Sequence, residues 1–470
     1  APPDAPAPPS ENLALLIGVM RTVLEGEIGP QDNFYALGGD SIKAIQISSR
    51  LRERGASLSV GDILRNPQLT RMADFMSRSD ADETAKEAQG EVPVTPPIRW
   101  FLDQHLAEQG QYNQSMLLRL LRPMSAAQVG PVLEALVQHH DALRLNLDKD
   151  GRLFYNPAHR AARVPVEEMS IDRLEEIHRL ETSFDLSHQL LLRARMVHCG
   201  EERYLFLTLH HLVVDGVSWR ILLDDLAALF ARQERGEDLR LGHKSDSYQT
   251  FARMLTGLDE PPCPACACDG FLRADAHVDH VILPRAVTAS LLARREERRR
   301  VQDGLLTALY QSLRKTGWDS PLLLEREGHG RDRVPQANTE RTVGWFTSFE
   351  RILVSDGNEG ENTPPDTRVP GQEEEARYGA SLVRWNYLGE LNEEANGYFE
   401  PIPAIWRGDH SPKNRAGCRL CVDVLIARGQ LEAYFTYSSK DADCQKLSRC
   451  FLKTLESILA DYPGRLSARP

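Results

Sequence analysis

The sequence predicts a small all-α unit of four helices followed by a large α/β region. The chain has 470 residues, more than one hydrophobic core usually organises, so two or three domains are expected. Helical spacing of apolar residues dominates residues 11–76, whereas strand patterns and helical patterns are mixed in residues 93–470. Between these regions, residues 77–92 are polar and contain almost no core-forming residue. They are expected to form a mobile linker.

The N-terminal unit begins after a proline-rich stretch. Residues 1–10 contain five prolines and are expected to form an extended linker from a domain upstream. Ser10 can cap a helix whose apolar side chains recur three and four positions apart, namely Leu13, Leu16, Ile17, Met20 and Leu24. Two shorter helical stretches, near residues 60–65 and 70–76, contribute to a bundle of four.

The remaining helix of this unit displays a hydroxyl group at its start. Gly38 and Gly39 interrupt regular structure, and Asp40 is a good helix cap. Ser41 therefore lies in the first turn of a helix that ends near Gly55. The positive end of the helix dipole favours a phosphate at this position. The alternative is that Ser41 is an ordinary capping serine.

Two adjacent histidines follow a predicted buried strand in the large region. The strand spans residues 204–209, and His210 and His211 stand at its end. Gly216 allows a tight turn before the next helix. An imidazole held at the edge of a rigid element is well placed to transfer protons. One or both histidines could instead be core groups, but the pair followed by Asp215-Gly216 favours a functional site.

The run His210-His211-x-x-x-Asp215-Gly216 resembles the signature of the condensation-domain superfamily of nonribosomal peptide synthetases, and Val217-Ser218-Trp219 is similar to its epimerization branch. The run Leu37-Gly38-Gly39-Asp40-Ser41 resembles the attachment motif of peptidyl carrier proteins. This resemblance implies that Ser41 carries a covalent 4′-phosphopantetheine arm, whose thiol holds an amino acid as a thioester. The resemblance to the condensation-domain superfamily implies that the large region consists of two chloramphenicol-acetyltransferase-like lobes, each a mixed sheet with helices packed on it.

The resemblance leads to a division of the chain into five parts. They are a linker at 1–10, a carrier domain at 11–76, a mobile linker at 77–92, and an epimerization domain with lobes at 93–262 and 263–470.

Further motifs resemble the same family in order along the chain. Residues 97–101 resemble its opening motif, residues 139–144 its second motif, and residues 341–348 a later one. His139 and His140 end a predicted amphipathic helix over 126–140 and are interpreted as structural. The resemblance implies that Arg144 pairs with Asp215, since a buried carboxylate needs a partner.

In the second lobe, the remaining elements follow from periodicity and composition. Strands are predicted at 277–283, 322–327 and 431–437, and helices at 287–316 and 444–459. Residues 294–300 hold five arginines, interpreted as a solvated face, with a contact to the carrier's phosphate as the alternative. Residues 259–270 are expected to cross between the lobes, and residues 355–376 to form a long flexible loop.

Two stretches of the second lobe contribute candidate site residues. The predicted strand at 322–327 runs into Glu327-Gly328-His329-Gly330-Arg331, which resembles a motif of the epimerization branch. Glu325 and Glu327 share a strand face, so geometry alone leaves both open, and the resemblance selects Glu327. Trp385-Asn386-Tyr387-Leu388-Gly389 resembles the family's final signature, and Asn386 and Tyr387 can donate hydrogen bonds.

These residues can support cofactor-independent epimerization, from L to D, at the α-carbon of an aminoacyl or peptidyl thioester. Inversion needs a proton removed on one face and delivered on the other, and His211 and Glu327 supply such a pair. Burial would raise the pKa of the Glu327 carboxyl toward neutrality. Asn386 or Tyr387 could hold the enolate oxygen. The residues predicted to support this site are His210, Asp215, Gly216, Arg144 and Trp219.

Two other functions stay open at this point. A condensation domain shares the histidine motif but forms a peptide bond. A docking module with a decayed site is suggested by departures from the family's motifs at residues 349–351 and 370–379.

Composition bears on partners and location. The net charge of −12 argues against nucleic-acid and anionic-membrane partners. No apolar run reaches spanning length, and eight cysteines are too few for a disulfide framework, so a cytoplasmic location is expected. Cys263 and Cys266 lack a second pair of ligands nearby, and no metal is predicted. The expected partners are an upstream adenylation domain, a downstream condensation domain and a phosphopantetheinyl transferase.

Overall fold

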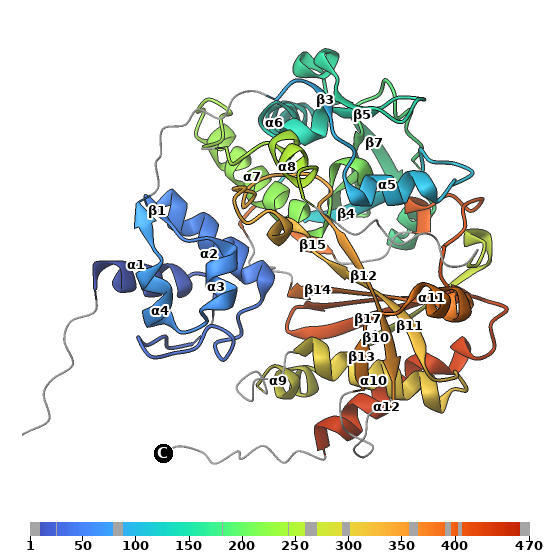
Figure 1. Ribbon diagram of the computed structural model, residues 1–470. Coiled ribbons are helices and arrows are strands. Elements are labelled where there is room, and N and C mark those ends of the chain that lie inside the picture. The colour runs from blue at the N-terminus through green and yellow to red at the C-terminus, as the bar shows by residue number, and fades with distance from the viewer. Residues whose placement is uncertain are drawn as a thin grey trace, which may run out of the picture.

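A small helical unit lies beside a large two-lobed domain in the computed structural model (Figure 1). The structure describes residues 10–24, 26–78, 88–180, 182–242, 244–258, 270–293, 301–356, 365–390, 396–402 and 407–460. No helix in these ranges is long and apolar enough to cross a lipid bilayer. The cysteine pair at 263 and 266 and the arginine run at 294–300 lie outside the described residues, so the interpretations placed on them stay untested.

The small unit is the predicted bundle of four helices. Its helices are α1 (Glu11–Met20), α2 (Ser41–Glu53), α3 (Val60–Arg65) and α4 (Leu69–Asp74). The apolar stripe of α1 packs into a core that includes Phe34, Ile47 and Met72, all fully buried. Asp40 caps α2 because its carboxylate accepts the amide N–H groups of Ile42 and Lys43, at 3.0 and 2.8 Å.

The predicted mobile linker is ordered at both ends. Strand β2 (Ser77–Arg78) pairs with β1 (Ala56–Ser57) of the small unit. At the other end, β3 (Gly90–Val92) pairs with β6 (Leu153–Tyr155) of the large domain. Backbone pairing thus replaces the predicted flexibility in these segments, and residues 79–87 lie outside the described ranges.

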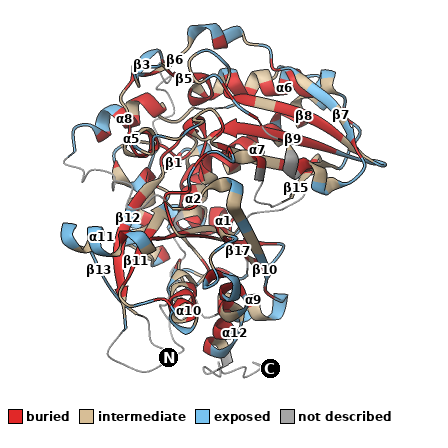
Figure 2. Cartoon of the chain, turned by 90° about the vertical axis from the view of Figure 1, so that its right-hand side faces the viewer, coloured by how far each residue is buried: buried red, intermediate tan, exposed pale blue. Residues whose placement is uncertain are grey.

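The first lobe is built on a five-stranded sheet of order β15-β4-β9-β8-β7. Its strands are β4 (Asn113–Leu120), β7 (Val166–Ile171), β8 (Leu192–Cys199), β9 (Glu202–His210) and β15 (Phe399–Ile402). A second, three-stranded sheet joins β3 and β6 to β5 (Leu145–Leu147). The helices are α5 (Pro96–Asp103), α6 (Ala126–His139), α7 (Gly216–Glu234) and α8 (Tyr248–Leu255). Apolar residues of these helices and of the sheet share one core, which is drawn red in Figure 2.

The second lobe is a mixed seven-stranded sheet of order β10-β17-β16-β14-β11-β12-β13. Its strands are β10 (Ala276–Ile282), β11 (Leu322–Gly328), β12 (Ser348–Ser355), β13 (Asp366–Arg368), β14 (Val383–Glu390), β16 (Leu420–Ala427) and β17 (Gln430–Ser438). Helices α9 (Arg285–Ala293), α10 (Val301–Lys315) and α12 (Leu447–Ala460) cover one face (Figure 1). This face is apolar because alternate residues such as Leu324, Trp385 and Val422 point into the core beneath the helices.

Two segments depart from the predicted layout. Strand β15 lies in the range predicted for the second lobe, yet it pairs with β4 of the first lobe's sheet. The predicted flexible loop at 355–376 contains β13 and the start of α11 (Gln372–Tyr378). Figure 2 shows both elements mostly exposed at one edge. In the described part of this stretch, β13 pairs with β12 and Glu374 pairs with Arg368, whereas residues 357–364 lie outside the described residues. The domain boundaries stay predictions.

Candidate functional site

The two adjacent histidines at the end of β9 have different surroundings. The His210 ring is fully buried, its Nε2 donates to the carbonyl oxygen of Gln109 at 2.8 Å, and its Nδ1 accepts the amide N–H of Leu212 at 3.1 Å. Both ring nitrogens are therefore used to hold the turn. His211 lies on the other side, where Nδ1 is buried without a hydrogen-bond partner among the described residues. The structure thus separates a structural histidine from one available for chemistry.

The protonation of His211 is set by a chain of two hydrogen bonds. The indole N–H of Trp219 can only donate, and it donates to Oε1 of Gln114 at 3.1 Å. The amide nitrogen of Gln114 must then face Nε2 of His211, 2.9 Å away, as a donor. Nε2 therefore carries the lone pair and Nδ1 the proton. Trp219, predicted as a supporting residue, acts through Gln114, which the sequence did not identify.

Aromatic rings enclose the His211 imidazole. Trp345 stacks on it with a centroid distance of 4.2 Å, and Tyr112 stacks at 5.6 Å. Burial lowers the pKa of His211 to about 4, because an imidazolium loses its hydration there. At pH 7 the ring is neutral and can accept a proton.

A buried ion pair joins the turn after His211 to the second lobe. Asp215 accepts from Arg331 at 2.8 and 3.3 Å, from Ser218 N–H at 2.7 Å and from Phe346 N–H at 3.1 Å. Burial alone would raise the pKa of Asp215, but the charge and hydrogen bonds of Arg331 outweigh burial and hold the pKa below its usual range. This arrangement fixes the loop of the first lobe against the glutamate motif of the second.

The predicted pairing of Arg144 with Asp215 is wrong. Arg144 donates to the carbonyl oxygens of Val137 and Gln138 at the end of α6 and to Asp141 at 2.6 Å. These local acceptors satisfy the guanidinium, whereas Arg331 reaches Asp215 from 116 positions away in sequence. Arg144 therefore stabilises the end of α6 and does not touch the site.

Gly330 is required by the close approach of two segments in this region. Its φ of +66° is left-handed, and a Cβ atom there would lie 1.8 Å from the carbonyl oxygen of Phe346. Any side chain at Gly330 would thus displace the segment that carries Trp345 against His211. Close packing against Phe346 therefore explains why glycine occupies position 330.

The structure distinguishes the two candidate glutamates of β11. Glu325 is fully buried, and its carboxylate accepts from Arg351 at 3.2 Å and from Arg384 at 3.0 Å. Glu327 lies on the same face two residues further, half-buried, and makes no hydrogen bond or ion pair within the described ranges. Burial raises the pKa of Glu327 to about 8, against the opposing charge of Arg384. Glu325 is therefore structural, and Glu327 retains its proton at neutral pH.

Asn386 and Tyr387 point to opposite faces of β14, because side chains alternate along a strand. Tyr387 packs against the core beneath the helices, together with Trp385. Asn386 lies on the other face, where its amide contacts Asp423 at 3.3 Å. The register of β11 with β14 pairs Arg326 with Trp385, so Glu327 and Asn386 are the next residues along the two parallel strands. Asn386 thus shares the face of Glu327, and Tyr387 does not.

Asp423 and Tyr112 belong to the site and were not predicted. Burial raises the pKa of Asp423, and its negative charge is one of the influences that raise the pKa of Glu327. Tyr112 lies between the two halves, stacked on His211, and burial raises the pKa of its hydroxyl, with Arg384 opposing and Glu327 adding to the shift. Asp423 is the single charged residue within the apolar run 420–427, and that isolated charge was the one signal for it in the sequence.

The helical unit contacts the large domain near the end of β14. Lys43 of α2 pairs with Glu390 at 2.8 Å, and Arg52 pairs with Glu340 at 3.0 Å. A Cβ atom on Gly389 would lie 2.9 Å from Cδ1 of Ile42 and 3.7 Å from Asp40. Ser41, the first residue of α2, therefore lies at the end of β14, whose middle carries Asn386.

An arginine at this junction has unused hydrogen-bonding capacity. Arg220 donates to the carbonyl oxygens of Gly216, Leu388 and Glu390. Its Nε is buried without a partner among the described residues. Asp40 lies close enough to favour its charged form, although burial lowers the pKa of Arg220.

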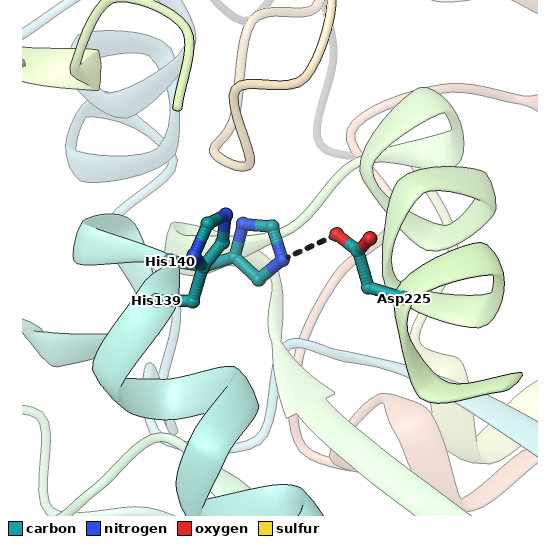
Figure 3. A group of neighbouring side chains, drawn as sticks. All are labelled: His139, His140 and Asp225. Atoms are coloured by element: carbon teal, nitrogen blue, oxygen red, sulfur yellow. Dashed lines mark hydrogen bonds and ion pairs between the residues drawn. The ribbon is translucent and has the colours of Figure 1, made fainter. Parts of the chain in front are cut away.

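The second histidine pair is part of a structural network (Figure 3). His140 bonds Asp225 at 2.9 Å, and Arg341 pairs with the other oxygen of that carboxylate. The ligand atoms of His139, His140 and Asp225 lie within 4.8 Å of one another. The pKa of His139 is lowered mainly by burial and by His140, and to a smaller extent by the positive charges of Lys244 and Arg341. These nearby positive charges also oppose the binding of a metal cation. The group therefore anchors α6 to α7.

Two segments of the chain match known families. Residues 14–76 match the family described as phosphopantetheine attachment site, and residues 88–260 match the condensation domain. The carrier family is the one that bears covalently attached 4′-phosphopantetheine.

Curated relatives are multidomain synthetases. Surfactin synthase subunit 1 of Bacillus subtilis (strain 168) is 32% identical over 92% of this chain and 14% of its own length. Tyrocidine synthase 1 of Brevibacillus parabrevis is 27% identical over 96% of this chain and 48% of its own length. The chain thus spans less than half of each of these proteins.

Solved structures share the fold of the large domain. The epimerization domain from the third module of tyrocidine synthetase B superimposes with a TM-score of 0.68 at 21% identity, covering 81% of this chain and 99% of that one. The first condensation domain of the calcium-dependent antibiotic synthetase superimposes with a TM-score of 0.60 at 17% identity, covering 79% and 97%. Both branches of the family therefore have this fold.

Proposed function

Because this chain belongs to the nonribosomal peptide synthetase family and joins a phosphopantetheine carrier domain to a condensation-superfamily domain, we propose that the large domain epimerizes the acyl group held by its own carrier. The reaction would invert the α-carbon of an aminoacyl or peptidyl thioester without a further cofactor. One observation carries the proposal: Tyr112 stacks on the neutral imidazole of His211 and lies near enough to Glu327 for that carboxyl to raise the pKa of the tyrosine, while burial raises the pKa of Glu327 itself.

The two groups have the protonation states that inversion requires. With pKa values of about 8 and about 4, Glu327 is mainly protonated and His211 neutral at pH 7. Once the Gln114 amide gives up its hydrogen bond to Nε2, His211 can remove the α-proton through that nitrogen on one face, while Glu327 delivers a proton to the other. After inversion His211 carries the added proton and Glu327 is ionised. In the reverse direction Glu327 therefore removes the α-proton and His211 delivers one.

Other residues of the chain hold the reacting groups in place. The Asp215–Arg331 pair fixes the loop of His211 relative to Glu327. Asn386 lies level with Glu327 and can donate a hydrogen bond to the carbonyl oxygen as negative charge develops there. Such a donor is typically worth about 3 kcal/mol. Tyr387, on the opposite face, has no part in this proposal.

The carrier supplies the substrate from the side of α2. We place the attachment at Ser41, with the guanidinium of Arg220, which lies near Asp40, as a positive charge close to the phosphate. When bound, the arm supplies the thiol that presents the acyl group as a thioester. The ion pairs of Lys43 and Arg52 keep the start of α2 at the mouth of the site.

Condensation is the second candidate, because its family shares the histidine motif and the fold. It uses no acid on the opposite face, and it would leave Glu327 without a role. The test is to prime the chain with a phosphopantetheinyl transferase, load it with an L-aminoacyl group, and offer a second carrier bearing an acceptor amino acid. We expect the D-isomer to accumulate on the carrier. A dipeptide with an unchanged α-carbon would favour condensation.

A further inference from the structure

Two cysteines lie against each other where the chain enters β16. Cys418 is fully buried and Cys421 is 8% exposed, and their Sγ atoms are 2.8 Å apart. Both are free thiols. A disulfide bond is about 2.05 Å long, so the two sulfur atoms need to approach by only about 0.8 Å to form one. The spacing Cys-x-x-Cys is one that redox-active thiols use.

A fixed bend brings the two thiols together. Gly417 has a left-handed φ of +68°, and the chain bends over residues 417–419 before β16 begins. The guanidinium of Arg419, inside the bend, pairs with Asp441 and with Asp443, each at 2.7 Å. Because the fold already holds the bend, the thiols meet without a further loss of chain entropy.

The two thiols differ in acidity. A hydrogen bond from Cys418 lowers the pKa of the Cys421 thiol, and the charges of Arg273 and Arg384 lower it further, against the effects of burial and of Asp423. The same hydrogen bond, together with burial, raises the pKa of Cys418 well above its usual range. Cys421 is therefore the sulfur that ionises, and Cys418 keeps its proton. A thiolate beside a second thiol is the arrangement that favours oxidation to a disulfide.

The pair lies on the sheet face that carries the proposed site. Cys421 shares a face of β16 with Asp423, because side chains alternate along a strand, and Asp423 is opposite Asn386 in the register with β14. Burial is the main cause of the raised pKa of Glu327, and negative charge at Cys421 adds to it. A disulfide carries no charge, so oxidation of the pair would change the electrostatics next to Glu327.

We propose that Cys418 and Cys421 are a redox pair, which hydrogen peroxide converts to a disulfide beside the site and a thiol reductant restores. The Cys421 thiolate attacks one oxygen of the peroxide, the O–O bond breaks, and hydroxide leaves, so that Cys421 becomes a sulfenic acid. The Cys418 sulfur then attacks the Cys421 sulfur, the S–O bond breaks, and water leaves with the proton of Cys418. In total, two thiols are oxidised to one disulfide while one peroxide is reduced to two water molecules. The inference does not depend on the proposed epimerization.

A purely structural role makes the opposite prediction. Both cysteines belong to a small apolar cluster that includes Phe271 and Leu382. If the thiols only fill this cluster, the fold protects them, and unfolding should speed their oxidation. In a redox pair the fold supplies both the bend and the charges that ionise Cys421, so unfolding should slow the reaction.

The experiment uses the position of Arg419 between the two cysteines. Trypsin cuts after this arginine, so a disulfide joins peptide 416–419 to peptide 420–428. The full chain is treated with hydrogen peroxide, remaining thiols are blocked, and the digest is analysed by mass spectrometry. We expect the linked peptides, and dithiothreitol should separate them. Cys444→Ser, which removes another fully buried thiol, is the matched control and should still give the linked peptides.

Two variants and one comparison test the mechanism. Cys418→Ser should stop at the sulfenic acid of Cys421, which dimedone labels, whereas Cys421→Ser should leave Cys418 unlabelled. At pH 7 the wild type should form the link roughly threefold to tenfold faster when folded than in urea, because the ionised fraction of Cys421 rises more than its nucleophilicity falls. Cysteines that stay unlinked, or that link faster in urea, would overturn the redox pair.

Discussion

Replacing Glu327 with glutamine tests the division of labour between the two lobes. The amide keeps the shape of the carboxyl group but cannot give up or take a proton. Because the pKa of Glu327 is about 8, roughly ten carboxyl groups are protonated for each ionised one at pH 7. The wild type therefore has its acid ready, and Glu327→Gln has none. We expect inversion to slow by about 10² to 10⁴.

The assay starts from each stereoisomer separately, loaded on the primed chain in deuterated water. In Glu327→Gln, His211 can still exchange the α-hydrogen of the isomer that presents it to its face, with retention. The other isomer should keep its hydrogen. Glu350→Gln, which alters an exposed carboxylate on the neighbouring strand, is the control and should behave as wild type. A Glu327→Gln variant that inverts both isomers at nearly the original rate would refute the reasoning.

The same substitution should change how stability depends on pH. The pKa of Glu327 in the folded protein lies above the ordinary value of 4.5 for a glutamate carboxyl, so stability that is fully present below about pH 4.5 is lost as the pH rises through about 8. The shift sets an upper limit of about 5 kcal/mol, and solvent in the cavity reduces this to about 1 to 3 kcal/mol. Urea unfolding at pH 6 and pH 9 should show this loss in the wild type and a smaller one in Glu327→Gln.

Four further substitutions test other parts of the account. Ser41→Ala should prevent the mass increase produced by a phosphopantetheinyl transferase while leaving the circular dichroism spectrum unchanged; a mass increase would place the attachment elsewhere. His211→Ala should lose about 10² to 10⁴ in inversion rate, whereas His210→Ala should mainly lower the unfolding temperature, and equal catalytic losses in equally stable variants would contradict this. Arg331→Met should lose about 3 to 5 kcal/mol in urea unfolding by leaving Asp215 buried and unpaired, and a loss below 1 kcal/mol would show that the pair is not needed.

Much of the fold could be predicted because the information is local. The strand predicted at 204–209 is Glu202–His210, and the strand predicted at 322–327 is Leu322–Gly328. Alternating or continuous apolar residues determine such elements over a short window. Strand Phe399–Ile402 carried no comparable signal, because its four residues are placed by pairing with a distant strand of the other lobe.

The candidate site was predictable where a motif brings its own residues together. His211 and Glu327 were identified from such runs, but the partner of Asp215 was not. Arg144 was chosen from sequence, and its guanidinium is occupied by acceptors close in sequence, whereas Arg331 approaches through tertiary packing. Asn386 and Tyr387 of the final motif were both predicted to be site residues, although side chains alternate along a strand and these two point to opposite faces.

Gln114 shows why the rest of the site was missed. Nothing in its local sequence marks it, since a glutamine in a strand is unremarkable by itself. It acquires a role only because β4 pairs with β9 and places its amide between Trp219 and His211. Such a contact depends on the register of two strands nearly a hundred residues apart, which periodicity does not fix.

The central claim is that His211 and Glu327 exchange protons with opposite faces of the same α-carbon. The most direct measurement loads the primed wild-type chain with an L-aminoacyl group in deuterated water, quenches it within the first turnovers, and determines configuration and α-deuterium together. The account predicts that newly formed D-isomer carries deuterium at the α-carbon, because its proton is delivered from a solvent-exchanged group. D-isomer that retains the original α-hydrogen, or an L-isomer that shows neither exchange nor inversion, would contradict it.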